Sequence, residues 1–331
     1  MSSGERTAVA PGAGAAPRDG PVPLPRSVAV TGISGNLGKA LAKLLHTETR
    51  IFGIDRRPFR EKPKDIEHHQ VDVRKKRVED LFRRHRIEAL IHLGIMHDPR
   101  MPASETHSFN VVGTQKILDI CVRHDVKKVV VLSSANVYGP MPGNSNFLPE
   151  ETPLMAAARF SDVRDLIEVD MYAQSFNWQH PAMETVILRP VNIVGPTVRN
   201  APSNYLRLER PITVLGFDPM VQLIHEVDVC RALALALRPG IRGIYNITGP
   251  GQLPLSAVLA ELGRKPVPIP HFLVRPLVEK LFEARLSSFP PGEIDHIQYL
   301  CAVDGSRAVR DLGWAPRYSL RETIRSVLGS G

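Results

Sequence analysis

Residues 28–38 read VAVTGISGNLG, and this stretch decides the fold. The apolar residues 28–30 predict a buried strand, and the leucines that follow the loop recur at helical spacing. Gly32 permits a tight turn, Gly35 lets the backbone approach a pyrophosphate, and Gly38 lets the helix pack closely on the sheet. The helix N-terminus then offers free N–H groups to a phosphate. The stretch therefore predicts a strand, a phosphate-binding loop and a helix.

Apolar segments repeat this alternation of strand and helix along the chain. Expected strands cover residues 51–54, 69–71, 89–91, 129–132, 185–188 and 243–247. Expected helices cover residues 104–124, 227–237, 276–285 and 320–328. Continuously apolar strands joined by helical crossovers indicate a parallel sheet that is covered on both faces. The sequence predicts an α/β fold with a doubly wound parallel sheet and a smaller, mixed C-terminal region.

Composition and hydrophobic pattern divide the chain into three parts. Residues 1–26 are rich in Ala, Gly and Pro and predict a disordered leader. We expect residues 27–194 to form the dinucleotide-binding domain and residues 195–331 the substrate-binding region. Within the latter, residues 225–247 are expected to return to the large sheet.

The net charge of +8 raises the question of nucleic-acid binding. The densest basic clusters, residues 74–77 and 83–86, are interrupted at helical spacing by Val78, Leu81 and Phe82. This pattern is typical of the solvent-exposed face of an amphipathic helix, so we expect no nucleic-acid partner. No apolar stretch approaches the ~20 residues that a transmembrane helix needs.

The three cysteines, Cys121, Cys230 and Cys301, are widely spaced and lie in apolar surroundings. Their odd number and spacing argue against a disulfide framework and against a metal site. We expect buried free thiols, no bound metal and a cytoplasmic location.

Asp55 ends the second expected strand at the distance from the glycine loop that a dinucleotide site requires. A carboxylate there accepts hydrogen bonds from the adenosine ribose hydroxyls and repels a 2′-phosphate, which favours NAD. Arg56 and Arg57 follow directly and leave NADP as the less favoured cofactor.

A series of further motifs runs in order along residues 27–328. They are Asp72-Val73, IHLG at 91–94, NVVGT at 110–114, SSANVYG at 133–139, RPVNIVGP at 189–196, YNI at 245–247 and LGWAP at 312–316. With the GxxGxxG spacing of the loop, they resemble the extended branch of the short-chain dehydrogenase/reductase family. That branch, the NAD-dependent epimerase/dehydratase group, includes the UDP-glucose 4-epimerases.

The resemblance implies a Rossmann fold with NAD bound at its glycine loop, a homodimer, and a nucleotide sugar as the small-molecule substrate. The implied cofactor residues are Gly32, Ser34, Gly35, Asn36, Leu37, Gly38, Asp55, Arg56, Asp72, Val73, Leu93, Gly94, Asn110, Arg164 and Pro190. The implied substrate residues are Ser134, Asn136, Asn192 and Arg207. The implied dimer interface lies on the helices expected near residues 104–124 and 157–176.

The resemblance breaks at the reaction centre, where the family has a Tyr and, four residues later, a Lys. Aligned on the trailing Glu168, the Tyr position holds Phe160 and the Lys position holds Arg164, with Ser134 in place as the family's serine. Phenylalanine has no proton to exchange, whereas Arg164 can still donate hydrogen bonds to the nicotinamide ribose. His97 is an alternative base, although a surface-loop histidine is the favoured interpretation.

Three functions stay open on these residues. The first is a nucleotide-sugar epimerase or oxidoreductase with a remodelled base. The second is a non-catalytic sensor or scaffold that responds to dinucleotide occupancy. The third is a lipid- or sterol-type oxidoreductase, suggested by an apolar stripe along residues 272–282 that otherwise serves as core or a lid.

Overall fold

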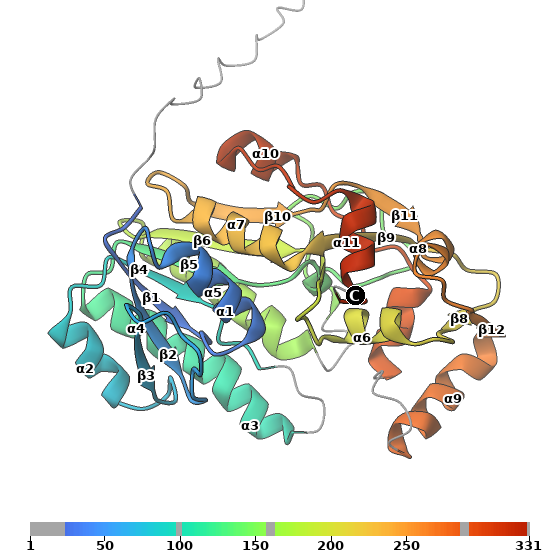
Figure 1. The fold of residues 1–331 in the computed structure, drawn as a ribbon, viewed down its shortest axis with the longest axis horizontal. Coiled ribbons are helices and arrows are strands. Elements are labelled where there is room, and N and C mark those ends of the chain that lie inside the picture. The colour runs from blue at the N-terminus through green and yellow to red at the C-terminus, as the bar shows by residue number, and fades with distance from the viewer. Residues whose placement is uncertain (1–23, 97–100, 157–162, 285–290, 330–331) are drawn as a thin grey trace, which may run out of the picture.

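The computed structural model describes residues 24–96, 101–156, 163–284 and 291–329. Its centre is a seven-stranded sheet of order β10-β6-β5-β4-β1-β2-β3 (Figure 1), in which all neighbouring strands are parallel. The strands are β1 (Ser27–Thr31), β2 (Arg50–Asp55), β3 (Glu67–Gln70), β4 (Ala89–His92), β5 (Lys128–Leu132), β6 (Glu184–Pro190) and β10 (Gly243–Ile247). The predicted α/β class with a parallel Rossmann sheet is confirmed.

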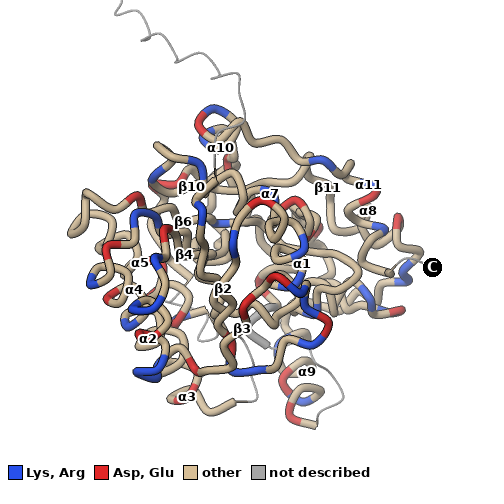
Figure 2. The backbone as a smooth tube through the Cα atoms, turned by 60° about the vertical axis from the view of Figure 1, so that its left-hand side comes forward, with Lys and Arg blue, Asp and Glu red and all other residues tan. Residues whose placement is uncertain are grey.

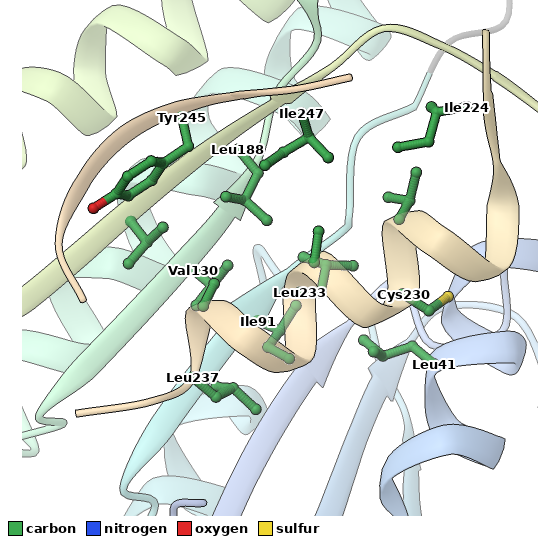
Figure 3. Packing of buried hydrophobic residues seen from close by; sticks show 14 of the residues in the cluster. Leu41, Ile91, Val130, Leu188, Ile224, Cys230, Leu233, Leu237, Tyr245 and Ile247 are labelled. Carbon is green, nitrogen blue, oxygen red and sulfur yellow. The ribbon is translucent and has the colours of Figure 1, made fainter. Parts of the chain in front are cut away.

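Helices cover both faces of this sheet. On one face lie α1 (Asn36–Leu45) and α7 (Glu226–Ala236); on the other lie α2 (Arg77–Arg84), α4 (Gly113–Arg123) and α5 (Arg164–Gln179). Figure 3 shows Leu233 of α7 and Leu237, which directly follows that helix, in one cluster with Val130 of β5 and Leu188 of β6. This two-sided burial explains why the strands are apolar throughout rather than alternating.

The helix expected over residues 104–124 is interrupted. It comprises α3 (Ala103–His107), a π-helical turn η1 (Ser108–Val112) and α4. The turn carries Asn110, whose carboxamide accepts from Met96 N at 2.7 Å and donates to Met96 O at 2.8 Å. Single π-helical turns occur frequently at functional sites.

Beyond β6 the chain builds a smaller unit that adjoins the sheet. Its strands are β7 (Asn192–Val194), β8 (Ile212–Val214), β9 (Met220–His225), β11 (Gln252–Pro254) and β12 (Val267–Ile269). Its helices are α6 (Ala201–Arg207), α8 (Leu255–Glu261), α9 (His271–Glu283), the 3₁₀ segment η5 (Pro291–Ile297) and α11 (Leu320–Ser326), while α10 (Ser306–Leu312) packs on the large sheet. Over residues 195–223 the sequence predicted only loops, whereas α6, β8 and the start of β9 lie there. The three residues of β8 are too few to show periodicity.

The apolar stripe of α9 is divided between core and surface. Val274 and Val278 are buried in the core of the smaller unit, whereas Phe272, Leu273 and Leu277 are exposed, Phe272 by 74%. The helix begins at His271 rather than at the predicted residue 276.

Basic and acidic residues are intermixed along the described chain (Figure 2). On α2, Val78, Leu81 and Phe82 are buried and the arginines lie outside, as expected of an amphipathic helix. Within the described ranges, no helix combines the length and apolarity that a bilayer crossing needs. In the same ranges no group of three or more His, Cys, Asp or Glu side chains is placed to hold a metal ion.

The predicted leader boundary at residue 26 is slightly too late. Arg26 N donates to Glu88 at 2.7 Å, and the Pro25 carbonyl accepts from Thr49 at 2.5 Å, so residues 24–26 already join the fold. Residues 1–23 lie outside the described part of the chain.

Candidate cofactor and substrate site

The glycine loop is tightly packed, as its sequence requires. Gly32 has a φ of +71°, and a Cβ on it would lie 2.9 Å from the Leu93 carbonyl. A Cβ on Gly38 would lie 2.5 Å from the Gly32 oxygen. Gly35 is the N-cap of α1, and among the described residues no side chain caps this helix. Its first-turn N–H groups are therefore free to bind a phosphate.

A cleft of about 400 Å³ opens beside this loop, at the carboxyl ends of the central strands. Ten of the predicted cofactor residues line it: Gly32, Gly35, Asn36, Leu37, Gly38, Asp55, Arg56, Val73, Leu93 and Gly94. The sequence analysis missed Ile95, Met96 and Phe109, which also line it. Their position just after β4, and just before Asn110 of the NVVGT motif, was the available signal.

Asp55 is held at the mouth of the cleft with its side chain only 4% exposed. Its carboxylate accepts from Ser34 N at 3.1 Å, Arg57 N at 2.9 Å and the Arg57 guanidinium at 3.1 Å. Ser34 thus orients Asp55 rather than lining the cleft. The Arg56 guanidinium lies 5.3 Å from the centre of the Phe109 ring and 3.1 Å from Met96 Sδ, so it reaches across the cleft.

Three predicted cofactor residues take other places. Asp72 is bound by the Arg74 guanidinium at 2.7 Å, and Pro190 is buried at the end of β6. Arg164 is exposed on the first turn of α5. None of the three lines the cleft.

A second pocket of about 190 Å³ shares Ile95 and Met96 with the cleft. It brings together three of the predicted substrate residues, Ser134, Asn136 and Asn192. Its remaining described lining residues are Asn110, Val163, Asp165, Leu166, Val191, Ile193, Asn200, Ala201 and Pro202. Ser134 Oγ accepts from Asn136 N at 3.1 Å and so begins the 3₁₀ turn η2 (Ala135–Val137) that shapes this wall.

Helix α5 turns Asp165 and Leu166 toward the second pocket, while Arg164 does not line it. The Asp165 carboxylate lies 3.0 Å from His107 Nδ1 and accepts from Asn110 Nδ2 at 3.3 Å. Phe160 and His97, the expected Tyr position and the alternative base, lie outside the described residues.

A buried polar network supports the serine wall from behind. Arg189 and Asp170 are 1% and 0% exposed and are joined at 2.6 Å, and Asp170 also accepts from Ser133 at 2.6 Å. Arg189 donates to the Tyr138 hydroxyl at 2.8 Å. Burial raises the pKa of Tyr138, so this phenol stays protonated and does not provide a base beside Ser134.

The predicted substrate role of Arg207 does not match its contacts. Its guanidinium donates to the carbonyl oxygens of Gly195 at 2.9 Å, Val198 at 2.8 Å and Val327 at 2.9 Å. Arg207 lines neither pocket; it braces the loop after β7 against the end of α11. A guanidinium is well suited to this because its donors diverge in a fixed fork.

Comparison with known proteins agrees with this geometry. The model of the NAD dependent epimerase/dehydratase family matches residues 28–248. The uncharacterized protein Rv0501 of Mycobacterium tuberculosis is 26% identical over 258 residues, 77% of this chain and 69% of that protein. UDP-glucose 4-epimerase of Bacillus subtilis is 25% identical over 326 residues, 87% of this chain and 85% of that protein.

Solved structures support the same fold. The structure of UDP-glucose 4-epimerase with UDP-glucose from Thermotoga maritima superposes with a TM-score of 0.70 at 19% identity, covering 91% of this chain and 97% of that one.

Proposed function

Because this chain belongs to the NAD-dependent epimerase/dehydratase family, we propose that it holds NAD in the cleft and a substrate alcohol or ketone in the second pocket. One observation carries the proposal: the cleft beside the glycine loop and the pocket with Ser134 share Ile95 and Met96. A dinucleotide that binds its pyrophosphate at the loop extends toward this junction.

The residues of the cleft fit NAD, the cofactor of the family. Gly32 and Gly38 leave no room for a side chain and so fix the tight loop, and Asp55 offers a buried carboxylate to a ribose. Bound NAD supplies a hydride acceptor for an alcohol or, when reduced, a hydride donor for a ketone. The hydroxyl of Ser134 and the side-chain amides of Asn136 and Asn192 orient the substrate oxygen.

Oxidation of an alcohol also requires a base for the hydroxyl proton. The described residues of the second pocket include no Tyr or Lys, and Asp165 is their one ionisable side chain. We assign the Asp165 carboxylate as the base that accepts the substrate hydroxyl proton. His107, whose Nδ1 lies 3.0 Å from this carboxylate, passes the proton to solvent. A carboxylate is a weaker base than a phenolate, so turnover should be slow.

A second candidate function is a sensor that binds NAD without turnover. The observation that favours it is that both Asp165 oxygens already have partners in Asn110 and His107. Nucleotide-sugar epimerase activity, as in the names of relatives, is the first chemistry to test in either case.

Titration calorimetry with NAD tests the binding step. Turnover is tested by NADH absorbance at 340 nm with simple alcohols and, because epimerisation regenerates NAD, by formation of the 4-epimer from UDP-glucose. We expect Asp165→Asn to lower turnover ~100-fold or more while NAD affinity changes less than about twofold. Asp311→Asn, on the exposed side of α10, is the matched control. Absence of turnover with NAD bound would select the sensor, and absence of NAD binding would refute the proposal.

We further propose that two copies pair through α4 and α5. These helices expose the large apolar side chains Val122, Met171 and Trp178, the last by 83%, and such exposed apolar surface is typical of an interface. Trp178→Glu should convert a dimer to a monomer in analytical ultracentrifugation, whereas Val309→Glu on α10 should not. A wild-type monomer at all concentrations would refute the pairing.

A further inference from the structure

A smaller chamber of about 50 Å³ adjoins the second pocket, since Asn192 and Pro202 line both. The chamber wall is almost entirely apolar. Its remaining lining residues are Tyr205, Leu206, Val221, Leu223, Leu255, His296 and Ile297. They come from α6, β9, α8 and η5, and most belong to the core cluster of the smaller unit. The body of any substrate held at Ser134 therefore meets apolar side chains.

The described lining of the pocket and the chamber contains no Lys or Arg. Two arginines near the lining in sequence are engaged: Arg207 binds three backbone carbonyls, and Arg199 donates to the carbonyls of Pro196 at 2.8 Å and Val198 at 2.9 Å. Arg164, between the lining residues Val163 and Asp165, is exposed and does not line the pocket. A nucleotide diphosphate carries more than one negative charge, and burying it without cationic partners is strongly unfavourable. This wall does not fit such a group.

The polar side chains of the chamber do not supply a positive charge. Burial lowers the pKa of His296 to about 4, so its imidazole is neutral at pH 7. Tyr205 donates its hydroxyl to the Ile212 carbonyl at 2.8 Å. A neutral imidazole can exchange hydrogen bonds with an uncharged ligand but does not attract a phosphate.

A separate polar pocket around Arg275 does not compensate. It is lined by His271, Arg275, Ile294, Asp295, Gln298 and Tyr299, and it shares no lining residue with the substrate pocket or the chamber. Its guanidinium already faces the Asp295 carboxylate at 3.4 Å. A diphosphate there would meet a carboxylate as well as a cation.

We propose that the substrate is a neutral, largely apolar alcohol or ketone, whose oxygen lies at Ser134 and whose hydrocarbon body enters the chamber beyond Asn192. The proposal rests on the proposed NAD-dependent function and gives its substrate class. It predicts that nucleotide sugars bind this pocket more weakly than neutral alcohols do.

Calorimetric titrations of the NAD-loaded full chain with cyclohexanol, 4-tert-butylcyclohexanol, UDP and UDP-glucose test the proposal. The tert-butyl group should strengthen alcohol binding at least ~10-fold, because its burial removes several methyl groups from water. UDP and UDP-glucose should bind at least ~10-fold more weakly than 4-tert-butylcyclohexanol. Tighter binding of either nucleotide, or no gain from the tert-butyl group, would overturn it.

A variant pair places the effect in the chamber. Val221→Arg should remove the ~10-fold advantage of the tert-butyl group, and Val309→Arg, an exposed apolar site on α10, should keep it. If Val221→Arg does not fold, Val221→Thr serves instead, because its similar shape should retain the fold while weakening the preference ~3-fold. An unchanged preference in the folded variant contradicts the proposal. Failure of NAD itself to bind would instead reject the proposed function.

Discussion

Two glycines of the cofactor loop should respond differently to the same substitution. In Gly38→Ala, the new Cβ would lie 2.5 Å from Gly32 O and 2.6 Å from Ile33 Cα, both backbone atoms that cannot rotate away. Because these atoms are fixed, the overpacking should cost about 2–3 kcal/mol, the upper part of the usual range, while alanine in a helix regains about 1 kcal/mol relative to glycine. We therefore expect a net loss of about 1–2 kcal/mol in the free energy of unfolding.

Gly35→Ala should leave stability nearly unchanged. Gly35 has φ −70° and ψ 165°, which alanine adopts freely. Its Cβ would meet Gly32 O at 3.2 Å and the movable end of Arg57 at 3.5 Å. We expect a change within about 0.5 kcal/mol. The methyl group would stand where the backbone approaches the pyrophosphate, so NAD affinity should fall at least ~10-fold, or about 1.4 kcal/mol.

Urea unfolding followed by circular dichroism measures the first effect, and calorimetric titration with NAD measures the second. Gly143→Ala is the control, because a Cβ there meets nothing within 4 Å. Wild-type NAD affinity in Gly35→Ala would refute the placement of the pyrophosphate on this loop. Wild-type stability in Gly38→Ala would refute the packing argument.

Three other perturbations test different parts of the molecule. Asp170→Asn breaks the fully buried pair with Arg189 and should lower the free energy of unfolding by about 3–5 kcal/mol, seen as a lower urea midpoint; a loss below ~1 kcal/mol would contradict it. Burial lowers the pKa of His92 to about 4, below its unfolded value near 6.5. The stability that neutral His92 contributes is therefore full above pH 6.5 and is lost as pH falls toward 4. We expect the free energy of unfolding to be ~2 kcal/mol lower at pH 5 than at pH 7, and His92→Gln should remove this dependence. Ser134→Ala should weaken 4-tert-butylcyclohexanol binding ~3- to 10-fold with NAD affinity unchanged, and equal losses for both ligands would argue for misfolding instead.

The central sheet could be predicted nearly strand by strand because each strand is a local apolar run. The strand expected over residues 129–132 is observed as Lys128–Leu132, and that over 243–247 is observed without change. The strands of the smaller unit could not be predicted in this way. Its three-residue strands β7, β8, β11 and β12 form through pairing with partners distant in the sequence.

The reaction centre was less accessible to sequence reasoning. The alignment that assigned Arg164 to the Lys position used Glu168 as its landmark, but Glu168 is exposed, and the buried acid of this helix is Asp170. On α5, Asp165 and the next residue, Leu166, both line the second pocket. A helix advances 100° per residue, so the choice between Glu168 and Asp170 as landmark decides which side chains are assigned to the site.

The sequence by itself determined the glycine loop, Asp55 and the parallel sheet that carries them. Those features depend on backbone conformation and apolar burial over a few adjacent residues, which local composition specifies. Only the tertiary structure decided that Arg207 braces carbonyls, that Asp165 enters the pocket, and that Val221, Leu255 and Ile297 form one apolar wall. These side chains come from segments far apart in the chain, and their directions are set by packing between elements rather than by neighbours in sequence.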